Sequence, residues 1–433
     1  MTTAPWVYCG AARLPIPRAD VHVAPAPPAP SCDADEAIAR AFARPRGAPR
    51  LRMLARGAAS VAITIPDASR PCPSDTILTH LLEELALAGV PDTAVTVVIG
   101  CGLHATTTGA ERSALAGAGI CERLTVVDAQ GIESPVADLG ITRCGAPARI
   151  ADVVAGADLA ITVGIVEPHL YAGFSGGVKG VAIGCAGAET IAWTHRPRFV
   201  SRPGVALGVL RGNPFQRALT EIASRTSLAW GANLVVDDRG TLRDVAAGDP
   251  AGIQAHLAET HAPAWFHTVE DPADVVVVGV PPPKSDSFYQ ASRAVTNVGL
   301  AARPALRGGG LVLVCADLPQ AAGLGPAEQN CGALLSEAAS PQALVARGLR
   351  EPLGPGGQRA FMLARVLARY RVGVVGAGAA PFLASLEHLG VAAFDSVDAA
   401  LAREDAALGR RARVLAVANA IADLVRRRAP IPA

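Results

Sequence analysis

From Ser60 onward the chain alternates short runs of β-branched residues with longer stretches in which apolar residues recur at helical spacing. Each apolar run has the length of a buried strand, and each stretch between them is long enough for a helix that covers a sheet. The expected strands are 61–65, 94–99, 124–127 and 159–166, and the expected helices are 75–88 and 109–116. This order is typical of an α/β fold with a mostly parallel sheet.

A second series of the same kind follows a polar, proline-containing segment at 267–272. Its expected strands are 275–278, 311–314 and 372–375, and its expected helix is 289–300. The second series therefore predicts another α/β domain with a mostly parallel sheet.

The length of the chain agrees with two domains, because 433 residues exceed what one hydrophobic core usually serves. We expect an N-terminal α/β domain at residues 1–270 and a C-terminal α/β domain at 271–410. Residues 411–433 are expected to form a helix that packs back on the N-terminal domain. An active site in the cleft between the domains is the natural expectation.

Charge and hydropathy argue against nucleic-acid and membrane partners. The formal net charge is +1, with 39 basic and 38 acidic residues scattered along the chain, which gives no patch for a polyanion or an anionic membrane. No apolar run reaches the ~20 residues that a spanning helix needs, and the start lacks a signal-peptide pattern. We therefore expect a cytoplasmic protein with small-molecule partners, and nothing in the sequence indicates its oligomeric state.

Two compositional features bear on chemistry. Nine cysteines, an odd number without a Cys-x-x-Cys pair, predict reduced thiols and neither a disulfide framework nor a zinc knuckle. Lys179 and Lys284 are the only lysines among the 39 basic residues. A guanidinium never deprotonates, whereas a desolvated lysine amine can form covalent bonds, so a retained lysine suggests a chemical role.

Polar residues follow the first two expected strands. Asp67 and Arg70 lie in one turn, where the guanidinium suits a substrate carboxylate and the aspartate can hold a ribose or orient the arginine. A turn closed by an Asp–Arg pair is an equally good interpretation. His104 follows the second strand, and it can be a general base or a structural partner.

The richest segment follows the strand at 159–166. Within 167–180 it holds His169, Gly173, Ser175, Gly176, Gly177 and Lys179. Such dense glycines let backbone N–H groups approach a phosphate or a planar ring, although they also suit a simple tight connection.

Two further groups of residues lie later in the chain. His195 comes sixteen residues after Lys179, and imidazole is a natural ligand for nickel, copper or zinc. No histidine lies four residues from it, which excludes a His-Glu-x-x-His zinc site. In the second domain, Tyr289, Gln290 and Arg293 lie at the start of the expected helix, either as ligand contacts or as a solvated helix start.

Together these residues resemble a known family. The motifs are Asp67-x-x-Arg70-Pro, Gly102-x-His104, Pro168-His169-x-x-Ala-Gly-Phe-Ser-Gly-Gly-x-Lys179, His195 and Tyr289-Gln290-x-x-Arg293. In order and spacing, over roughly residues 55–320, they are similar to those of the nickel-dependent lactate racemase family.

The resemblance implies a set of roles. Lys179 would hold a nickel-pincer nucleotide, a pyridinium-3,5-bisthiocarboxylic acid mononucleotide, in a covalent link, and His195 would complete the square-planar coordination of nickel. His104 and His169 would be the catalytic residues. The further cofactor contacts would be Asp67, Gly173, Ser175, Gly176 and Gly177, and the substrate contacts Arg70, Tyr289, Gln290 and Arg293. The enzymes that make the cofactor would be cellular partners.

The implied reaction is racemisation or epimerisation of a small 2-hydroxy acid. Because the Cα–H beside a carboxylate is weakly acidic, hydride transfer to the cofactor and back avoids a carbanion, with one histidine serving each enantiomer. This chain has Arg293 where the family's lactate racemase has lysine, and no tryptophan near 353–358. Lactate is therefore one candidate among 2-hydroxy acids.

Three other hypotheses remain. Residues 173–177 match Gly-x-Ser-x-Gly, which is typical of a serine hydrolase, but the residues between strand and serine do not suit a nucleophile elbow. Gly376-Ala-Gly378-Ala-Ala-Pro381 resembles a dinucleotide-binding turn, with proline in place of its third glycine. The third is a catalytically silent homologue that binds the nucleotide.

Overall fold

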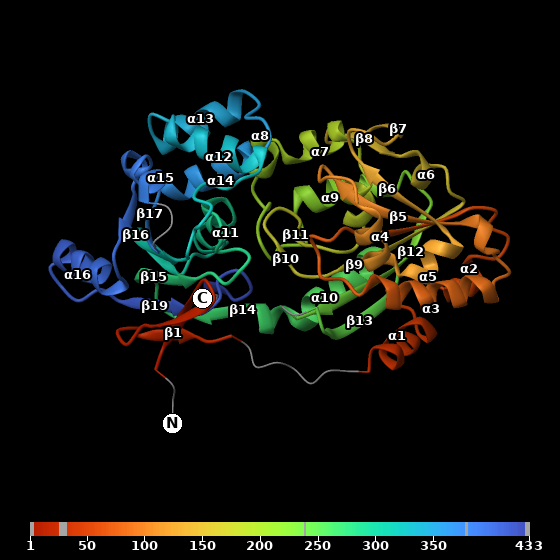
Figure 1. Cartoon of the computed structure of the whole chain (residues 1–433), viewed down its shortest axis with the longest axis horizontal. Helices are drawn as coiled ribbons and strands as arrows, with labels where there is room; N and C mark the ends of the chain where they lie inside the picture. Colours follow the sequence, from red (N-terminus) through yellow and green to blue (C-terminus); the bar gives the residue numbers. More distant parts are fainter. Residues whose placement is uncertain (1–3, 26–32, 238–239, 377–379, 429–433) are drawn as a thin grey trace, which may run out of the picture. The chain divides into compact units, whose positions relative to one another are not determined.

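The computed structural model describes residues 4–25, 33–237, 240–376 and 380–428. These residues form two compact units, each built around a six-stranded sheet (Figure 1). The first unit comprises Pro28–His195 and Phe199–Ala262, and the second comprises Met1–Pro27, Arg196–Arg198 and Pro263–Ala433. The α/β class with mostly parallel sheets is confirmed. The second unit differs from the expected domain in including the N-terminal residues and in beginning before residue 271.

The sheet of the first unit has the strand order β13-β12-β9-β4-β5-β6. Its strands are β4 (Val61–Pro66), β5 (Val95–Gly102), β6 (Thr125–Gln130), β9 (Leu159–Ile165), β12 (Leu228–Val236) and β13 (Leu242–Gly248). Neighbouring strands are parallel except for β13, which pairs antiparallel with β12. The carboxyl ends of β4, β5 and β9 therefore lie along the same edge of the sheet.

The remaining elements of the first unit cover this sheet or connect its strands. The helices are α1 (Ala34–Ala43), α2 (Leu51–Leu54), α3 (Ser74–Leu87), α4 (Gly109–Ala116), α5 (Ala118–Arg123), α6 (Asp152–Ala155), α7 (Ala188–His195), α9 (Pro214–Ala223) and α10 (Pro250–Trp265), with a 3-10 turn at Asp92–Ala94 and a π-helical turn at Gly180–Gly184. The short strands are β7 (Val136–Ile141), β8 (Pro147–Ala151), β10 (Pro168–His169) and β11 (Gly173–Phe174). The helix α8 (Pro197–Val200) spans a point where the chain passes between units.

Side-chain alternation along β4 and β9 explains how the π-helical turn reaches the sheet. One face carries Ile63 and Ile161, which are fully buried in a core with helices α1 and α3. The opposite face carries Thr64 and Thr162, which hydrogen-bond to each other at 3.1 Å. A Cβ at Gly180 would lie 2.4 Å from the Thr162 hydroxyl oxygen, so only glycine allows the turn to approach this closely.

The sheet of the second unit is parallel throughout, in the order β18-β17-β16-β15-β19-β3. Its strands are β3 (Val21–Val23), β15 (Ala273–Gly279), β16 (Leu306–Cys315), β17 (Arg371–Val375), β18 (Val391–Phe394) and β19 (Val414–Val417). Two smaller sheets pair β1 (Trp6–Cys9) with β2 (Ala12–Pro15), and β14 (Phe266–Val269) with β20 (Leu424–Arg427). The helices are α11 (Phe288–Gly299), α12 (Pro326–Ser336), α13 (Pro341–Arg350), α14 (Gly357–Leu367), α15 (Ala380–Ala384) and α16 (Val397–Leu408), with a 3-10 turn at Glu387–Leu389.

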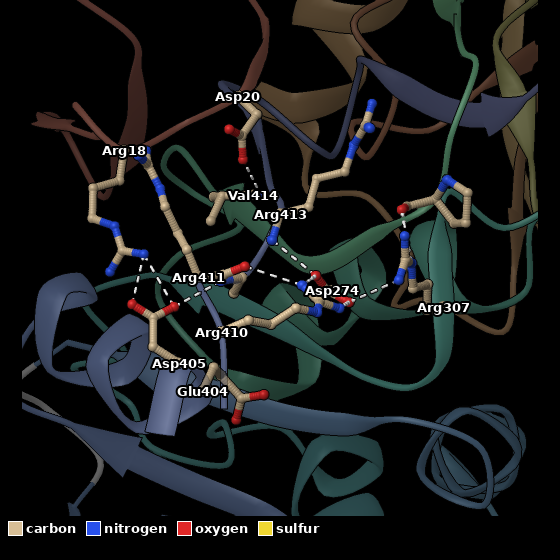
Figure 2. A network of polar contacts seen from close by, with 12 residues as sticks. Arg18, Asp20, Asp274, Arg307, Glu404, Asp405, Arg410, Arg411, Arg413 and Val414 are labelled. Atoms are coloured by element: carbon tan, nitrogen blue, oxygen red, sulfur yellow. Dashed lines mark hydrogen bonds and ion pairs between the residues drawn. The ribbon is translucent and has the colours of Figure 1, made fainter. Parts of the chain in front are cut away.

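The predicted helix at 411–433 is wrong over its described part, which forms β19 and β20. Figure 2 shows how polar contacts hold β19 in the second unit. Asp274 of β15 accepts two hydrogen bonds from the Arg410 guanidinium, at 2.8 and 2.9 Å, and one from the Arg413 backbone at 2.8 Å. On the other side of β19, the Asp20 carboxylate accepts the Val414 N–H at 2.7 Å. The buried valines of this segment fit a helix as well as a strand. Pairing with neighbouring strands makes the segment extended.

Other expectations can be compared directly. The polar segment 267–272, at which the sequence placed the domain boundary, contains most of β14 and belongs to the second unit. No helix among the described residues is long and apolar enough to cross a membrane. The eight described cysteines are free thiols. Gly378 of the possible dinucleotide-binding turn lies outside the described residues.

Candidate active site

The candidate site lies at the carboxyl ends of β4, β5 and β9, where parallel α/β sheets usually bind ligands. Asp67 and Arg70 follow β4, His104 follows β5, and the segment from Glu167 to Lys179 follows β9. His195 is the last residue of α7. The first unit alone therefore supplies all of these side chains.

Asp67 and His104 form the first pair of the site. The Nδ1 of His104 lies 2.5 Å from Oδ2 of Asp67. The other carboxylate oxygen accepts hydrogen bonds from the Ser69 hydroxyl at 2.6 Å and the Ser69 backbone at 3.2 Å. Burial raises the pKa of Asp67, but the hydrogen bonds from His104 and Ser69 outweigh burial and hold it below its usual value. Asp67 is therefore an ionised partner of His104.

Arg70 and Glu167 form a second pair, joined by an ion pair between Nη1 and Oε1. Both side chains are partly exposed, at 28% and 38%. Burial lowers the pKa of Arg70, against the opposing effect of Asp67. Since a guanidinium stays charged throughout the physiological range, Arg70 remains a cation that can bind a carboxylate.

Lys179 lies at the end of the glycine-rich loop, immediately before the π-helical turn. Gly176 and Gly177 have φ values of +75° and +55°, which bend the chain back across the end of β9. The loop is held by Asn233, whose side chain accepts the Gly177 N–H at 2.7 Å, and by Gln254, which donates to the Ser175 carbonyl at 2.9 Å. These hydrogen bonds therefore hold the turn that precedes Lys179.

The environment of Lys179 changes its ionisation. Burial lowers its pKa to about 7, and the charge of Arg70 lowers it further while Asp67 opposes the shift. The described residues form no hydrogen bond or ion pair with its side-chain amine. A substantial fraction of the amine is therefore neutral near pH 7, which is the nucleophilic form.

His195 presents one ring nitrogen away from its own helix. Its Nδ1 lies 3.0 Å from the Ile191 carbonyl oxygen, so Nδ1 carries the proton and Nε2 carries the lone pair. Burial lowers the pKa of His195 to about 4, with the Ile191 hydrogen bond opposing and the Lys179 charge adding to the shift. His195 is therefore neutral at physiological pH, the state that binds a metal.

Tyr171 connects His169 to His195 through ring contacts. Its ring centroid lies 5.9 Å from that of His169 and 5.6 Å from that of His195, both in edge-on geometry. The Nδ1 of His169 accepts the backbone N–H groups of Tyr171 at 3.3 Å and Ala172 at 3.1 Å. These contacts join His169 to His195. The charge of Lys179 acts on His195, and the charges of Arg70 and Asp67 act on Lys179, so these side chains are also near one another.

Comparisons with known proteins bear directly on this cluster. Residues 10–208 match the model of the lactate racemase N-terminal domain. The lactate racemase of Thermoanaerobacterium thermosaccharolyticum is 30% identical over 346 residues, which are 78% of each chain. This chain belongs to the lactate racemase family.

Further comparisons agree with that assignment. The lactate racemase of Lactiplantibacillus plantarum is 31% identical over 215 residues, 49% of this chain and 50% of the relative. The structure of the T. thermosaccharolyticum lactate racemase apoprotein shares the fold, with a TM-score of 0.86, 24% identity and coverage of 98% of this chain and 100% of that one. A Thermotoga maritima structural-genomics protein matches with a TM-score of 0.64 and 13% identity, covering 92% and 100%. As a member of the lactate racemase family, the chain is an isomerase of the racemase type.

In this lactate racemase family member, the loop residues Ser175 and Gly173 pack against neighbouring backbone groups of the same unit. Ser175 is 4% exposed. Its hydroxyl donates a hydrogen bond to the Ile165 carbonyl at 2.8 Å and accepts one from the Glu167 N–H at 3.0 Å. A Cβ at Gly173 would lie 2.0 Å from the Val209 carbonyl oxygen. These contacts make the Ser175 hydroxyl part of the loop's framework, which argues against a hydrolase nucleophile.

The residues predicted at the start of α11 lie in the second unit. Ser287 caps the helix by accepting the Gln290 N–H at 3.3 Å, and the Gln290 side chain donates to Glu328 at 3.4 Å. Arg359 stacks over the Tyr289 ring at 5.2 Å from its centroid. The roles of Tyr289, Gln290 and Arg293 in substrate binding stay predictions, as do the cofactor contacts of the loop.

Two residues of the cluster received no role from the sequence, Glu167 and Tyr171. Both lie inside the glycine-rich block, and their nearness to the predicted residues was the available signal. Pairing of Glu167 with Arg70 joins residues 97 positions apart, so it required the fold. Among the described residues, no three His, Cys, Asp or Glu side chains converge as a metal site.

Proposed function

We propose that this chain racemises or epimerises a small 2-hydroxy acid, with a nickel-pincer nucleotide held by Lys179 and His195. The observation that carries the proposal is that His195, whose Nδ1 meets the Ile191 carbonyl oxygen and whose Nε2 therefore holds the lone pair, lies near enough to the buried Lys179 amine to feel its charge. Burial lowers the pKa of Lys179 to about 7 and keeps His195 neutral. A neutral amine can form the covalent link, and a neutral imidazole can complete nickel coordination. When bound, this group supplies a hydride acceptor that later returns the hydride.

The residues of the chain would bind the substrate and move its hydroxyl proton. Arg70 offers a guanidinium to the substrate carboxylate, in exchange for Glu167. His104 and His169 are the candidate acid–base groups. The substrate is lactate or a related acid, and Arg293 in place of lysine favours an acid that a bidentate fork can hold. The enzymes that synthesise the cofactor would be the chain's cellular partners.

The experiment is co-expression with cofactor-making enzymes, followed by intact-protein mass, nickel content and a racemisation screen across 2-hydroxy acids. We expect a nucleotide-sized mass increase, about one nickel per chain and turnover of at least one acid. Lys179→Ala should abolish the mass increase. His195→Ala should keep the mass increase but lose the nickel. Fully active, loaded Lys179→Ala protein would refute the role of Lys179. A loaded, metal-bound chain without turnover would favour the silent homologue, and labelling of Ser175 by a fluorophosphonate would favour the hydrolase.

A further inference from the structure

His104 and His169 have unlike hydrogen-bond partners at the same ring atom, Nδ1. The Nδ1 of His104 faces a carboxylate oxygen of Asp67, which can only accept a hydrogen bond when ionised. The Nδ1 of His169 faces two backbone N–H groups, which can only donate. One ring must therefore carry its proton on Nδ1 and the other must leave Nδ1 unprotonated.

For His104, the contact fixes the lone pair of the neutral ring on Nε2. Asp67 is 13% exposed and is further held by two hydrogen bonds from Ser69. Its pKa lies below the usual value because the hydrogen bonds from His104 and Ser69 outweigh the effect of burial. The His104 side chain is 66% exposed, so the Asp67 contact fixes the ring while leaving most of its surface open.

For His169, the same reasoning gives the opposite result. A neutral ring whose Nδ1 accepts the N–H groups of Tyr171 and Ala172 carries its proton on Nε2. Moving that proton to Nδ1 would break both backbone contacts. The loop that contains His169 is closed by the β10–β11 pairing of His169 with Gly173, so these N–H groups cannot turn away freely.

We propose that in the resting chain His104 is the proton acceptor for a substrate hydroxyl, that Asp67 is its positioning residue, and that His169 presents an N–H donor. This inference rests on the proposed function. In the proton transfer the hydroxyl O–H bond breaks and an Nε2–H bond forms, so that His104 becomes an imidazolium beside the Asp67 carboxylate. An enantiomer whose hydroxyl meets His169 instead requires that histidine to shift its proton first.

The two tautomers can be observed on the full chain without cofactor or substrate, by nitrogen-15 NMR of labelled histidine. His104→Gln and His169→Gln assign the signals, and His261, whose Nε2 lies 2.9 Å from Asp244, is an internal reference for a carboxylate pair at the other nitrogen. We expect an Nδ1–H ring for His104 and an Nε2–H ring for His169. The same tautomer at both positions would overturn the proposal, whatever the chain's activity.

Asp67→Asn tests the positioning role, with Asp244→Asn as the matched control at a His–Asp pair outside the site. We expect Asp67→Asn to lose the Nδ1–H signal of His104 and to lower kcat about 100-fold, with mass and nickel content unchanged. Asp244→Asn should change neither. An unchanged kcat, or a loss of cofactor loading that accounts for the lost activity, would overturn the positioning role.

A kinetic measurement distinguishes this proposal from the proposed function itself. Because the two enantiomers of a substrate with one stereocentre have equal energies, kcat/KM must be equal in the two directions at any histidine arrangement. A difference between the two histidines therefore changes kcat and KM separately for the two enantiomers. It also changes the rate of a single turnover begun from each enantiomer. We expect a faster first turnover from one enantiomer. Equal first-turnover rates from the two enantiomers in an active enzyme would overturn this inference but not the proposed function. If the proposed function is wrong, no turnover will be seen, and the NMR result will still stand.

Discussion

At the scale of single residues, burial and neighbouring charge decide the chemistry of Lys179. Its ordinary pKa of 10.5 falls to about 7 because the folded chain desolvates the amine and places Arg70 nearby. Protonation is thus disfavoured in the folded chain, so this group costs stability in full below about pH 7. The cost declines as the pH rises from about 7 toward 10.5, the range in which only the unfolded chain still binds the proton. The rarity of lysine in the sequence pointed to Lys179. The groups that shift its pKa, Arg70 and Asp67, are distant along the chain.

Amine acylation provides a direct measurement, because the chain has only two lysines. With a small acylating reagent and peptide mass mapping, we expect the rate at Lys179 to rise with pH and level off above a midpoint near 7. Lys179→Arg should remove this signal, and Lys284→Arg should leave it. A rate at Lys179 that keeps rising to pH 10 would contradict the assigned ionisation.

At the scale of elements, the glycine-rich loop is shaped by close backbone approach. Gly173 has a φ of +83°, and a Cβ there would lie 2.0 Å from the Val209 carbonyl oxygen. Gly89 has the same φ of +83° but nothing within 4 Å of its Cβ position. The two positions therefore separate the cost of a left-handed conformation from the cost of a steric collision.

We expect Gly89→Ala to lower the free energy of unfolding by about 1 kcal/mol, from backbone strain alone. Gly173→Ala should cost at least about 2 kcal/mol more, because the loop and the Val209 segment must separate. Urea unfolding of the two variants beside the parent chain measures the difference. Equal losses would mean that the loop yields easily and does not hold Lys179 rigidly.

At the scale of the whole molecule, contacts between distant segments assemble the second unit. Asp274 of β15, 6% exposed, joins Arg410 and the backbone of Arg413, more than 130 positions away (Figure 2). Hydrogen bonds from Arg410, against the effect of burial, hold the pKa of Asp274 below its usual value. The stability it contributes is therefore complete above the unfolded value of about 4 and declines as the pH falls below that.

Asp274→Asn should lower the free energy of unfolding by about 2–3 kcal/mol at pH 7, because the buried Asp274 side chain loses its charge-assisted hydrogen bonds from the half-exposed Arg410 guanidinium. The difference in the free energy of unfolding between this variant and the parent chain should shrink as the pH falls below about 4. Asp271→Asn, at an exposed pair with Arg413, should cost under about 1 kcal/mol. Urea unfolding between pH 3 and 7 tests this, and a difference independent of pH would show that packing, not charge, explains the loss.

The sequence by itself determined the α/β class, four of the six strands of the first sheet and three of the six strands of the second, and it pointed to the candidate side chains of the site, because strand periodicity, turn residues and rare residue types are local properties. The lysine, the histidines and Arg70 could be selected in this way. Only the tertiary structure decided that β3 and β19 complete the second sheet, that Glu167 faces Arg70, and which groups His104, His169 and His195 meet at Nδ1. Sheet partners, desolvation and hydrogen-bond direction depend on groups far apart in the chain, and no local pattern records them.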